Sequence, residues 1–379
     1  MSGAAEAGRR PAAGAFAVSA WMHLLSGLVE RYPRFWIRLG RLETALLRER
    51  LEAIEIRAPI YVAGLARSGS TMLLEVLARH PDCASHRYED FPLIHVPWLW
   101  QQFLRRAPRR PAAARERAHA DGILITPQSP EAFEEVIWMA FFPWLHDPGQ
   151  NAWLGADFSA AEFEQYYRMH LRKLLLGRGA TRYLAKANYQ VTRLEYLLRL
   201  FPDARFVVPV RDPEWHIASL VRQHRRFCAI GRAAPRALAH LRRAGHFEFG
   251  LDRRAINPGD AATTRDIMAL WAGGEEIAGW ARYWALVHGA VASALADNPA
   301  LRAATLVVRH EDLCRVPEET LRRLFHHCRL PGAEALIATC APQLGFPTYY
   351  RPQFGAGERA LIAAATGPAR RRLEAFIPT

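Results

Sequence analysis

The most constraining feature of the sequence is the stretch from residue 59 to residue 74, PIYVAGLARSGSTMLL. A short apolar run is followed by a loop that contains Gly64 and Gly69, and the loop leads into an apolar helical pattern. A strand, a loop and a helix in this order direct backbone N–H groups and a helix N-terminus at an anion. Glycine lets the backbone pass close to that anion. The stretch therefore predicts a phosphate-binding loop.

The side chains of this loop indicate which phosphate compound it binds. Gly64, four residues and then Gly69 nearly match the loop of nucleoside triphosphate enzymes, but Ser70 stands where those enzymes have lysine. That lysine reaches the β- and γ-phosphates, so its replacement argues against hydrolysis of ATP or GTP. The hydroxyls of Ser70 and Thr71, and the permanently charged guanidinium of Arg67, remain as ligands for an anion.

A second strand and helix follow about 140 residues later in the chain. Residues 206–210, FVVPV, predict a buried strand, although Pro209 cannot donate to a sheet ladder and is expected near an edge or a bulge. Arg211 ends this strand, and Asp212 with Pro213 predicts a capped helix start. Ser219 lies two helical turns further on, eight residues after Arg211, and so brings a hydroxyl to the same region.

These two motifs together resemble the sulfotransferases that use 3′-phosphoadenosine 5′-phosphosulfate (PAPS). The Arg67 loop resembles the 5′-phosphosulfate loop, particularly that of bacterial and tyrosylprotein-type members, and the Arg211 and Ser219 pair resembles the group that holds the 3′-phosphate. The resemblance spans residues 57–330. It implies a P-loop-like α/β fold with a parallel sheet of about five strands and helices on both faces. It also implies in-line sulfuryl transfer from PAPS to a hydroxyl or amine, with PAP as product and no metal.

The resemblance implies a site in three parts. The donor-binding residues would be Arg67, Ser68, Gly69, Ser70, Thr71, Arg211 and Ser219. Arg67 would also be catalytic, because it stabilises charge on the leaving phosphate. Tyrosylprotein-type members have a glutamate base shortly after the loop helix, where this chain has Glu89 and Asp90 as equal candidates. His86 and His119 are the next candidates, and Asp121 is a possible contact to the acceptor.

Lys186 stands out against the composition of the chain. Only two of the 50 basic residues are lysines, Lys173 and Lys186. Lys186 ends a predicted strand at residues 183–186, and ligands bind at the carboxyl ends of parallel strands. We therefore add Lys186 to the expected donor-binding residues, whereas Lys173 lies within a helical pattern.

The remaining sequence predicts helices around this core. Residues 1–14 predict a disordered tail, residues 15–56 an N-terminal helical segment with leucines at helical spacing, and residues 57–379 a single sulfotransferase-like domain. Ser159 with Glu162, and Thr192 with Glu195, match the capping-box pattern at two helix starts.

Composition leaves two other function classes open. The formal net charge of +13 suits an anionic ligand, but the arginines are dispersed and match no nucleic-acid-binding motif, so we expect no nucleic-acid partner. A P-loop kinase or NTPase remains the main alternative. Five cysteines without metal-ligand spacing indicate a reduced compartment, and no apolar run is long enough for a membrane span. These features predict a cytoplasmic protein.

Overall fold

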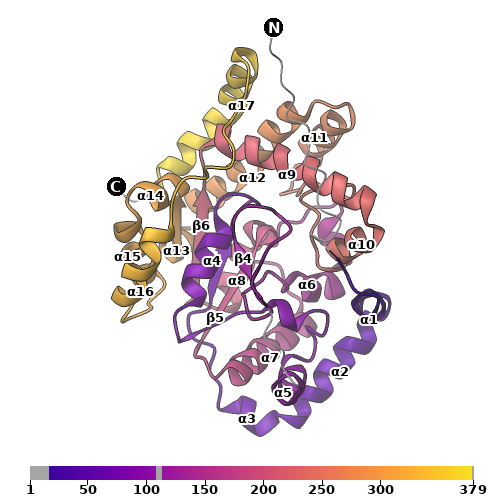
Figure 1. The fold of residues 1–379 in the computed structure, drawn as a ribbon. Coiled ribbons are helices and arrows are strands. Elements are labelled where there is room, and N and C mark those ends of the chain that lie inside the picture. The colour runs from indigo at the N-terminus through magenta and orange to yellow at the C-terminus, as the bar shows by residue number, and fades with distance from the viewer. Residues whose placement is uncertain (1–16, 108–112, 378–379) are drawn as a thin grey trace.

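The computed structural model describes residues 17–107 and 113–377, so the predicted tail at 1–14 lies outside the described residues. Its centre is a five-stranded parallel sheet in the order β2-β5-β1-β6-β7. The strands are β1 Ile60–Ala63, β2 Cys83–Ala84, β5 Arg182–Ala187, β6 Arg205–Val210 and β7 Thr305–Arg309. Helices cover both faces (Figure 1). The predicted α/β fold class is confirmed.

Helices surround this sheet, and further helices precede its first strand and follow its last strand in the chain. Their bounds are α1 Ala20–Arg31, α2 Pro33–Leu46, α3 Arg48–Glu52, α4 Ser70–Ala78, α5 Pro97–Arg106, α6 Glu135–Phe141, α7 Ala161–Arg178, α8 Leu194–Leu200, α9 Pro213–Ala233, α10 Pro235–Arg243, α11 Ala261–Ala272, α12 Glu276–Asp297, α13 Pro299–Ala304, α14 His310–Arg315, α15 Pro317–His327, α16 Glu334–Cys340 and α17 Ala356–Glu374. A small antiparallel pair, β3 Arg115–Glu116 and β4 Leu124–Ile125, stands apart from the main sheet.

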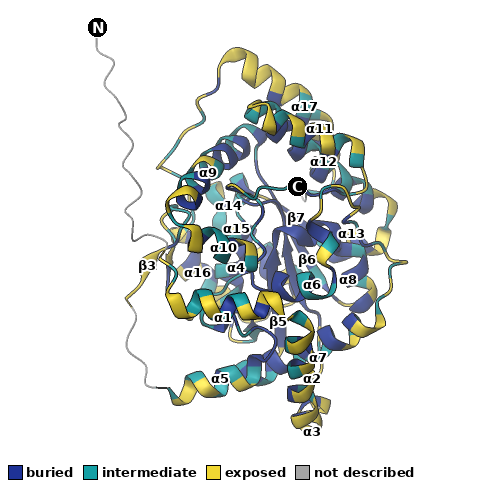
Figure 2. Ribbon diagram, turned by 90° about the vertical axis from the view of Figure 1, so that its right-hand side faces the viewer, coloured by how far each residue is buried: buried dark blue, intermediate teal, exposed yellow. Residues whose placement is uncertain are grey.

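Alternate residues of the central strands feed two separate cores. Ile60 and Val62 of β1 pack in the core that contains Leu73 and other residues of α4. Tyr61 and Ala63 point to the opposite face, into the larger core that includes α7, α8 and α12. This period of two is the side-chain alternation of a strand. The sheet is buried on both faces, as the dark blue strands in Figure 2 show.

The parallel pairing of β1 with β6 places the two predicted motifs at one edge of the sheet. Val62 pairs with Val207, and both strands end within a few residues of that point. Pro209 does not lie on an edge strand, because β6 has β1 on one side and β7 on the other. It pairs only with β7, beyond the last paired residue of β1, so its missing N–H breaks no β1–β6 hydrogen bond. The expectation of an edge strand is therefore wrong.

The helix starts agree only partly with the sequence. Asp212 caps α9 as predicted, because its carboxylate accepts from the N–H groups of Glu214 and Trp215, and Pro213 occupies the first turn. The two expected capping boxes are wrong. No side-chain cap forms at α7 or α8, which begin at Ala161 and Leu194, each one residue later than the pattern indicates.

Two further observations concern the whole described chain. All five cysteines are free thiols. Among residues 17–107 and 113–377, no helix combines the length and the apolar character that crossing a membrane requires.

We predict that Gly64→Ala disturbs the turn between β1 and the loop. A Cβ at this position would lie 2.8 Å from Cγ of Pro209 and 3.0 Å from Oγ of Ser68. Overpacking of this kind costs about 1–3 kcal/mol of unfolding free energy, which denaturant titration measures. Gly345→Ala is the matched control, since a Cβ there meets no described atom within 4 Å. Equal stability of the two variants would contradict the tight packing of the loop.

Candidate active site

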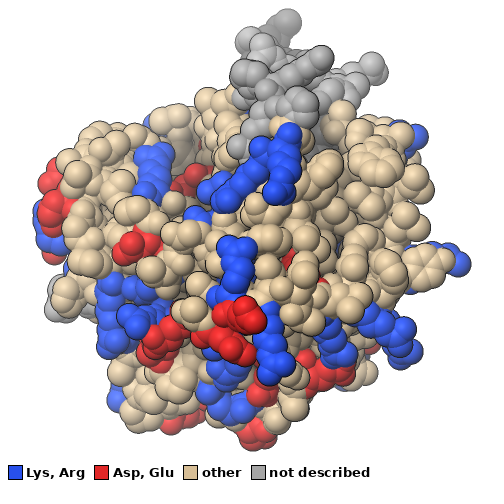
Figure 3. Space-filling model, turned by 90° about the horizontal axis from the view of Figure 1, so that it is seen from below, with Lys and Arg blue, Asp and Glu red and all other residues tan. Residues whose placement is uncertain are grey.

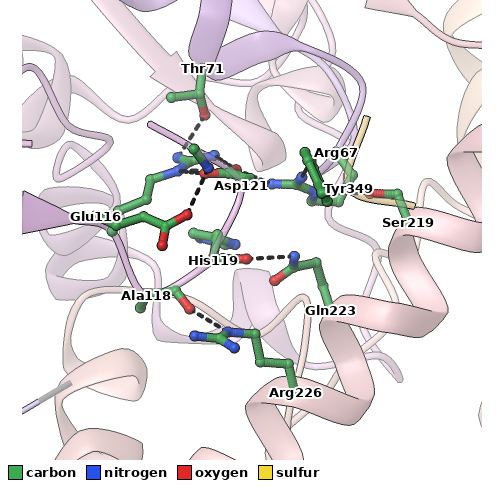
Figure 4. Close-up of polar contacts among 12 residues, drawn as sticks. Arg67, Thr71, Glu116, Ala118, His119, Asp121, Ser219, Gln223, Arg226 and Tyr349 are labelled. Carbon is green, nitrogen blue, oxygen red and sulfur yellow. Dashed lines mark hydrogen bonds and ion pairs between the residues drawn. The ribbon is translucent and has the colours of Figure 1, made fainter. Parts of the chain in front are cut away.

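The two phosphate motifs, far apart in the sequence, are in direct contact. Nε of Arg67 donates to Oγ of Ser219 at 3.1 Å (Figure 4). Nη1 of Arg211 donates to the backbone carbonyl of Arg67 at 3.3 Å. This contact follows from the β1–β6 pairing, because Arg67 lies on the loop after β1 and Ser219 lies two turns into the helix after β6.

The loop itself has the features of an anion cradle. Arg67 and Gly69 adopt left-handed backbone conformations with φ of 73° and 102°, which turns the chain sharply before α4. No described side chain caps the N-terminus of α4, so the N–H groups of its first turn stay available to a ligand. Oγ of Ser68 is buried and has no hydrogen-bond partner among the described residues. These groups fit a phosphate or sulfate.

A hairpin closes over this loop, and the sequence singled out only His119 and Asp121 of it as candidate site residues. It contains β3 and β4, and its turn carries Asp121. The Asp121 carboxylate accepts from Nη1 of Arg67 at 2.7 Å and from Nε of Arg117 at 2.9 Å (Figure 4). Nη1 of Arg117 also donates to Oγ1 of Thr71 at 3.2 Å. Arg117 and Arg67 thus face the same loop, with their charges balanced by one carboxylate.

Side chains of α9 fasten this hairpin to the body of the protein. Nε2 of Gln223 donates to the carbonyl of His119 at 2.9 Å, and Nε of Arg226 donates to the carbonyl of Ala118 at 2.7 Å (Figure 4). Because α9 also carries Ser219, one helix positions both the hairpin and the expected 3′-phosphate group.

A cavity of about 510 Å³ opens from the loop toward the N-terminal helices. Polar and charged residues line the part around the loop and the end of β5: Arg67, Ser70, Thr71, Glu89, Arg117, His119, Glu131, Lys186, Asn188, His246 and Glu248. Apolar and aromatic residues line the rest: Met22, Tyr88, Phe91, Ile125, Phe133, Phe227, Leu241 and Phe249. Arg211 lies outside this cavity and lines a neighbouring one of about 780 Å³, together with Trp215 and Arg351.

Lys186 is, like Arg117, a buried cation of the first cavity. It lies near the C-terminal end of β5, as the sequence predicts. Burial lowers its pKa, while the carboxylates of Glu131 and Glu248 oppose that effect. Burial alone would raise the pKa of Glu131, but Lys186, His246 and the hydroxyl of Tyr88 outweigh burial and lower it below 4.5. Lys186 and Glu131 therefore stabilise each other's charged forms.

The two acidic candidates from the sequence lie in different surroundings. Glu89 lines the cavity, and its Oε2 accepts from Nε2 of Gln128 at 3.0 Å. Asp90 does not line it. Both carboxylate oxygens of Asp90 accept from Nη2 of Arg178 at 2.7 Å, and Nδ1 of His86 is 3.5 Å away. Burial would raise the pKa of Asp90, but His86 and Arg178 lower it.

The two histidine candidates also lie in different surroundings. His86 contacts His170 through their Nε2 atoms at 3.1 Å, inside the protein and away from the cavity. His119 lines the cavity, and burial together with Arg117 and Arg67 lowers its pKa well below 6.5. His119 is therefore neutral at physiological pH.

Sequence reasoning missed Arg117, Glu131 and two tyrosines near the chain end. The hydroxyl of Tyr349 accepts a hydrogen bond from Nη2 of Arg67 at 3.1 Å. The ring of Tyr350 lies 5.7 Å from the guanidinium of Arg211. Their only sequence signal is the aromatic pair beside Arg351. Among the described residues, no cluster of three or more His, Cys, Asp or Glu side chains has the geometry of a metal site.

We predict that Lys186→Met destabilises the protein in a pH-dependent way. Without the lysine, burial raises the folded-state pKa of Glu131, so stability falls as pH rises through that value. The loss should approach about 3–5 kcal/mol above neutral pH and be smaller near pH 5. Urea titrations of Lys186→Met and of the charge-conserving Lys186→Arg at both pH values measure it. A pH-independent loss would show that Lys186 does not compensate Glu131.

Comparison with known proteins identifies the family of the chain. The sulfotransferase family profile matches residues 59–260. Similar solved structures are sulfotransferase STF1 from Mycobacterium tuberculosis H37Rv, with 15% identity, TM-score 0.49, and 94% of this chain and 88% of that chain covered, and sulfotransferase STF9 from Mycobacterium avium, with 17% identity, TM-score 0.48, and 89% and 82% covered. Comparison with curated protein sequences finds no match. With more than half of its length matched, the chain belongs to the sulfotransferase family.

Proposed function

We propose that this protein is a PAPS-dependent sulfotransferase that transfers the sulfuryl group to a hydroxyl or amine. Family membership supports sulfuryl transfer in general. The observation that carries the choice of donor is the hydrogen bond from Arg67 to Ser219, because it joins a 5′-phosphate loop to a candidate 3′-phosphate group. PAPS carries phosphate groups on both its 3′ and its 5′ side, so it can bind to both the loop and the Arg211 and Ser219 pair.

In this proposal the donor lies along the C-terminal edge of the sheet. The loop N–H groups of residues 68–71 and the free hydroxyl of Ser68 bind the 5′-phosphosulfate. Arg211 and Ser219 bind the 3′-phosphate by charge-assisted hydrogen bonds. Arg117 and Lys186, which line the cavity beyond the loop, face the sulfuryl group and stabilise its charge during transfer.

The transfer needs one nucleophile, one leaving group and one base. The acceptor oxygen or nitrogen forms a bond to sulfur as the bond between sulfur and the 5′-phosphate oxygen breaks. That electron pair remains on the phosphate of PAP, where Arg67 and the loop N–H groups stabilise it. The proton of the acceptor passes to a side chain of the protein.

Among the carboxylates, Glu131 is the proposed base. It lines the cavity near Lys186, it is ionised at neutral pH because its pKa is lowered, and it therefore can accept a proton. Glu89 lines the cavity as well, but its carboxylate interacts with Gln128, Arg87 and Arg178. Asp90 is held by Arg178 within the protein, so we place it in a structural role.

A P-loop kinase or NTPase is the competing function. Titrations with PAP and AMP, and with ATP and magnesium, distinguish it from the proposed sulfotransferase. Ser70 occupies the position of the phosphate-binding lysine. Titration calorimetry should detect binding of PAP in EDTA and much weaker binding of AMP, which lacks the 3′-phosphate. Binding of ATP that depends on magnesium, with no preference for PAP over AMP, would favour the kinase.

We predict that Arg211→Ala specifically weakens binding of the 3′-phosphate. One charge-assisted hydrogen bond contributes about 1.5–3 kcal/mol, so the Kd for PAP should rise about tenfold to hundredfold while the Kd for AMP changes little. Arg225→Gln is the matched control, because this exposed arginine on α9 removes the same charge away from the cavity. Equal loss of PAP and AMP affinity would place the 3′-phosphate elsewhere.

We predict that Glu131→Gln reduces the chemical step by about 10²-fold or more and leaves the Kd for PAP nearly unchanged. Single-turnover transfer from radiolabelled PAPS measures the first quantity and calorimetry the second. Glu89→Gln and Asp90→Asn, tested in parallel, should keep most of the rate. Full activity of Glu131→Gln with loss in Glu89→Gln would assign the base to Glu89.

The pH dependence gives an independent check on the base. Because the pKa of Glu131 is lowered below 4.5, the rate should stay constant as pH falls to about 5. His246 also lines the cavity, and Glu248 raises its pKa above 6.5 against the effect of burial. A rate that falls as pH drops below neutral would therefore identify His246, rather than a carboxylate, as the base.

A further inference from the structure

The N-terminal helices expose an unusual density of large apolar side chains. Leucines at helical spacing in this segment predicted helices, but several of them face solvent. On α1 the exposed residues are Trp21, Leu24 and Leu28, and on α2 they are Phe35, Leu42 and Leu46. The spacings of three, four and seven residues place each set on one side of its helix. Trp21 is 66% exposed and Leu46 is 69% exposed. We call these six residues the α1–α2 face.

The same two helices carry an excess of exposed positive charge. Their exposed basic residues are Arg31, Arg34, Arg38 and Arg41, of which Arg41 is paired with Glu162 of α7. Of the two acids within α1 and α2, Glu43 is buried against Lys173 at 2.9 Å. The other, Glu30, is paired with Arg242 and Arg243 of α10 at 3.4 and 2.8 Å. Apolar and cationic side chains together are typical of helices that lie on a membrane surface.

The α1–α2 face is connected to the cavity. Val18 and Ser19, which precede α1, and Met22 of α1 line the same cavity as the phosphate loop. Helix α1 therefore carries part of the α1–α2 face on one side and lines the cavity through Met22 on another side. In Figure 1, α1, α2 and α3 run along one border of the molecule, and Figure 3 shows basic side chains interspersed with acidic and uncharged surface on the underside.

We propose that the α1–α2 face docks on an anionic lipid bilayer. Trp21 and Phe35 would enter the headgroup region with the leucines, while Arg31, Arg34 and Arg38 contact lipid phosphates. The protein would lie on the membrane, since no described helix can cross it. A second copy of the chain fits this face less well. A twofold interface would bring the same arginines of both copies close together, at the cost of like-charge repulsion.

This orientation identifies the class of acceptor. With α1 on the bilayer, the cavity that Val18 and Met22 line lies behind the helix that contacts the lipid, and Phe91, Phe133 and Phe249 form an apolar part of its wall. The acceptor is then an apolar or aromatic compound dissolved in the membrane that carries a hydroxyl or amine. This assignment of the acceptor rests on the proposed function, whereas the docking itself does not.

Vesicle sedimentation of the full-length protein tests the docking. The chain should bind vesicles that contain phosphatidylglycerol and bind pure phosphatidylcholine vesicles weakly, with the difference reduced by salt. The triple variant Trp21→Gln, Leu24→Gln, Phe35→Gln should weaken binding at least about tenfold on both vesicle types. Arg34→Gln and Arg38→Gln should each weaken it about fivefold, on anionic vesicles only.

Leu361→Gln on α17 is the matched control, because Leu361 is a 40% exposed leucine far along the chain. Thermal unfolding should be the same for all variants, since every changed side chain is exposed. Absence of binding to anionic vesicles, or equal binding of the triple variant, would overturn the proposal. A dimer in analytical ultracentrifugation that the triple variant dissociates, without vesicle binding, would assign the face to a second copy. PAP titration of the same samples keeps this outcome separate from the proposed function.

Discussion

The parallel pairing of β1 with β6 is the constraint on which the rest of the site depends. With Val62 opposite Val207, the chain leaves both strands at the same edge of the sheet. The loop with Arg67 and the helix with Ser219 must then meet, and they do so through a hydrogen bond of 3.1 Å. The absence of a side chain at Gly64 lets the loop turn against the ring of Pro209. The position of the hairpin, which is fastened to α9, also depends on this junction.

The second organising principle is the balance of buried charge. Arg67 and Arg117 share Asp121, and Lys186 interacts with Glu131 and Glu248. Three cations near one loop would repel each other in a dry cavity, so the carboxylates stabilise the protein without its ligand. In the proposed function, a bound phosphosulfate would add negative charge to the same group of cations. The site is therefore prepared for an anion while remaining stable without one.

The sequence predicted the features that depend on short spacings. The loop after β1, Lys186 near the end of β5 and the cap formed by Asp212 can all be deduced from neighbouring residues, because local geometry fixes them. Contacts set by tertiary structure were missed. Nothing near Arg117 indicates that its hairpin folds over Thr71, and nothing near Ser159 indicates that α7 starts without a side-chain cap. Asp90 matched an expected base by position, but only the fold reveals that Arg178 holds it.

A structure of the protein with bound PAP tests the central claim most directly. The account predicts 5′-phosphate oxygens within hydrogen-bond distance of the backbone N–H groups of residues 68–71, and 3′-phosphate oxygens within reach of Arg211 and Ser219. One nucleotide would then span both motifs across the C-terminal ends of β1 and β6. PAP in the opposite orientation, or bound with only one of its phosphates at these motifs, would contradict the account.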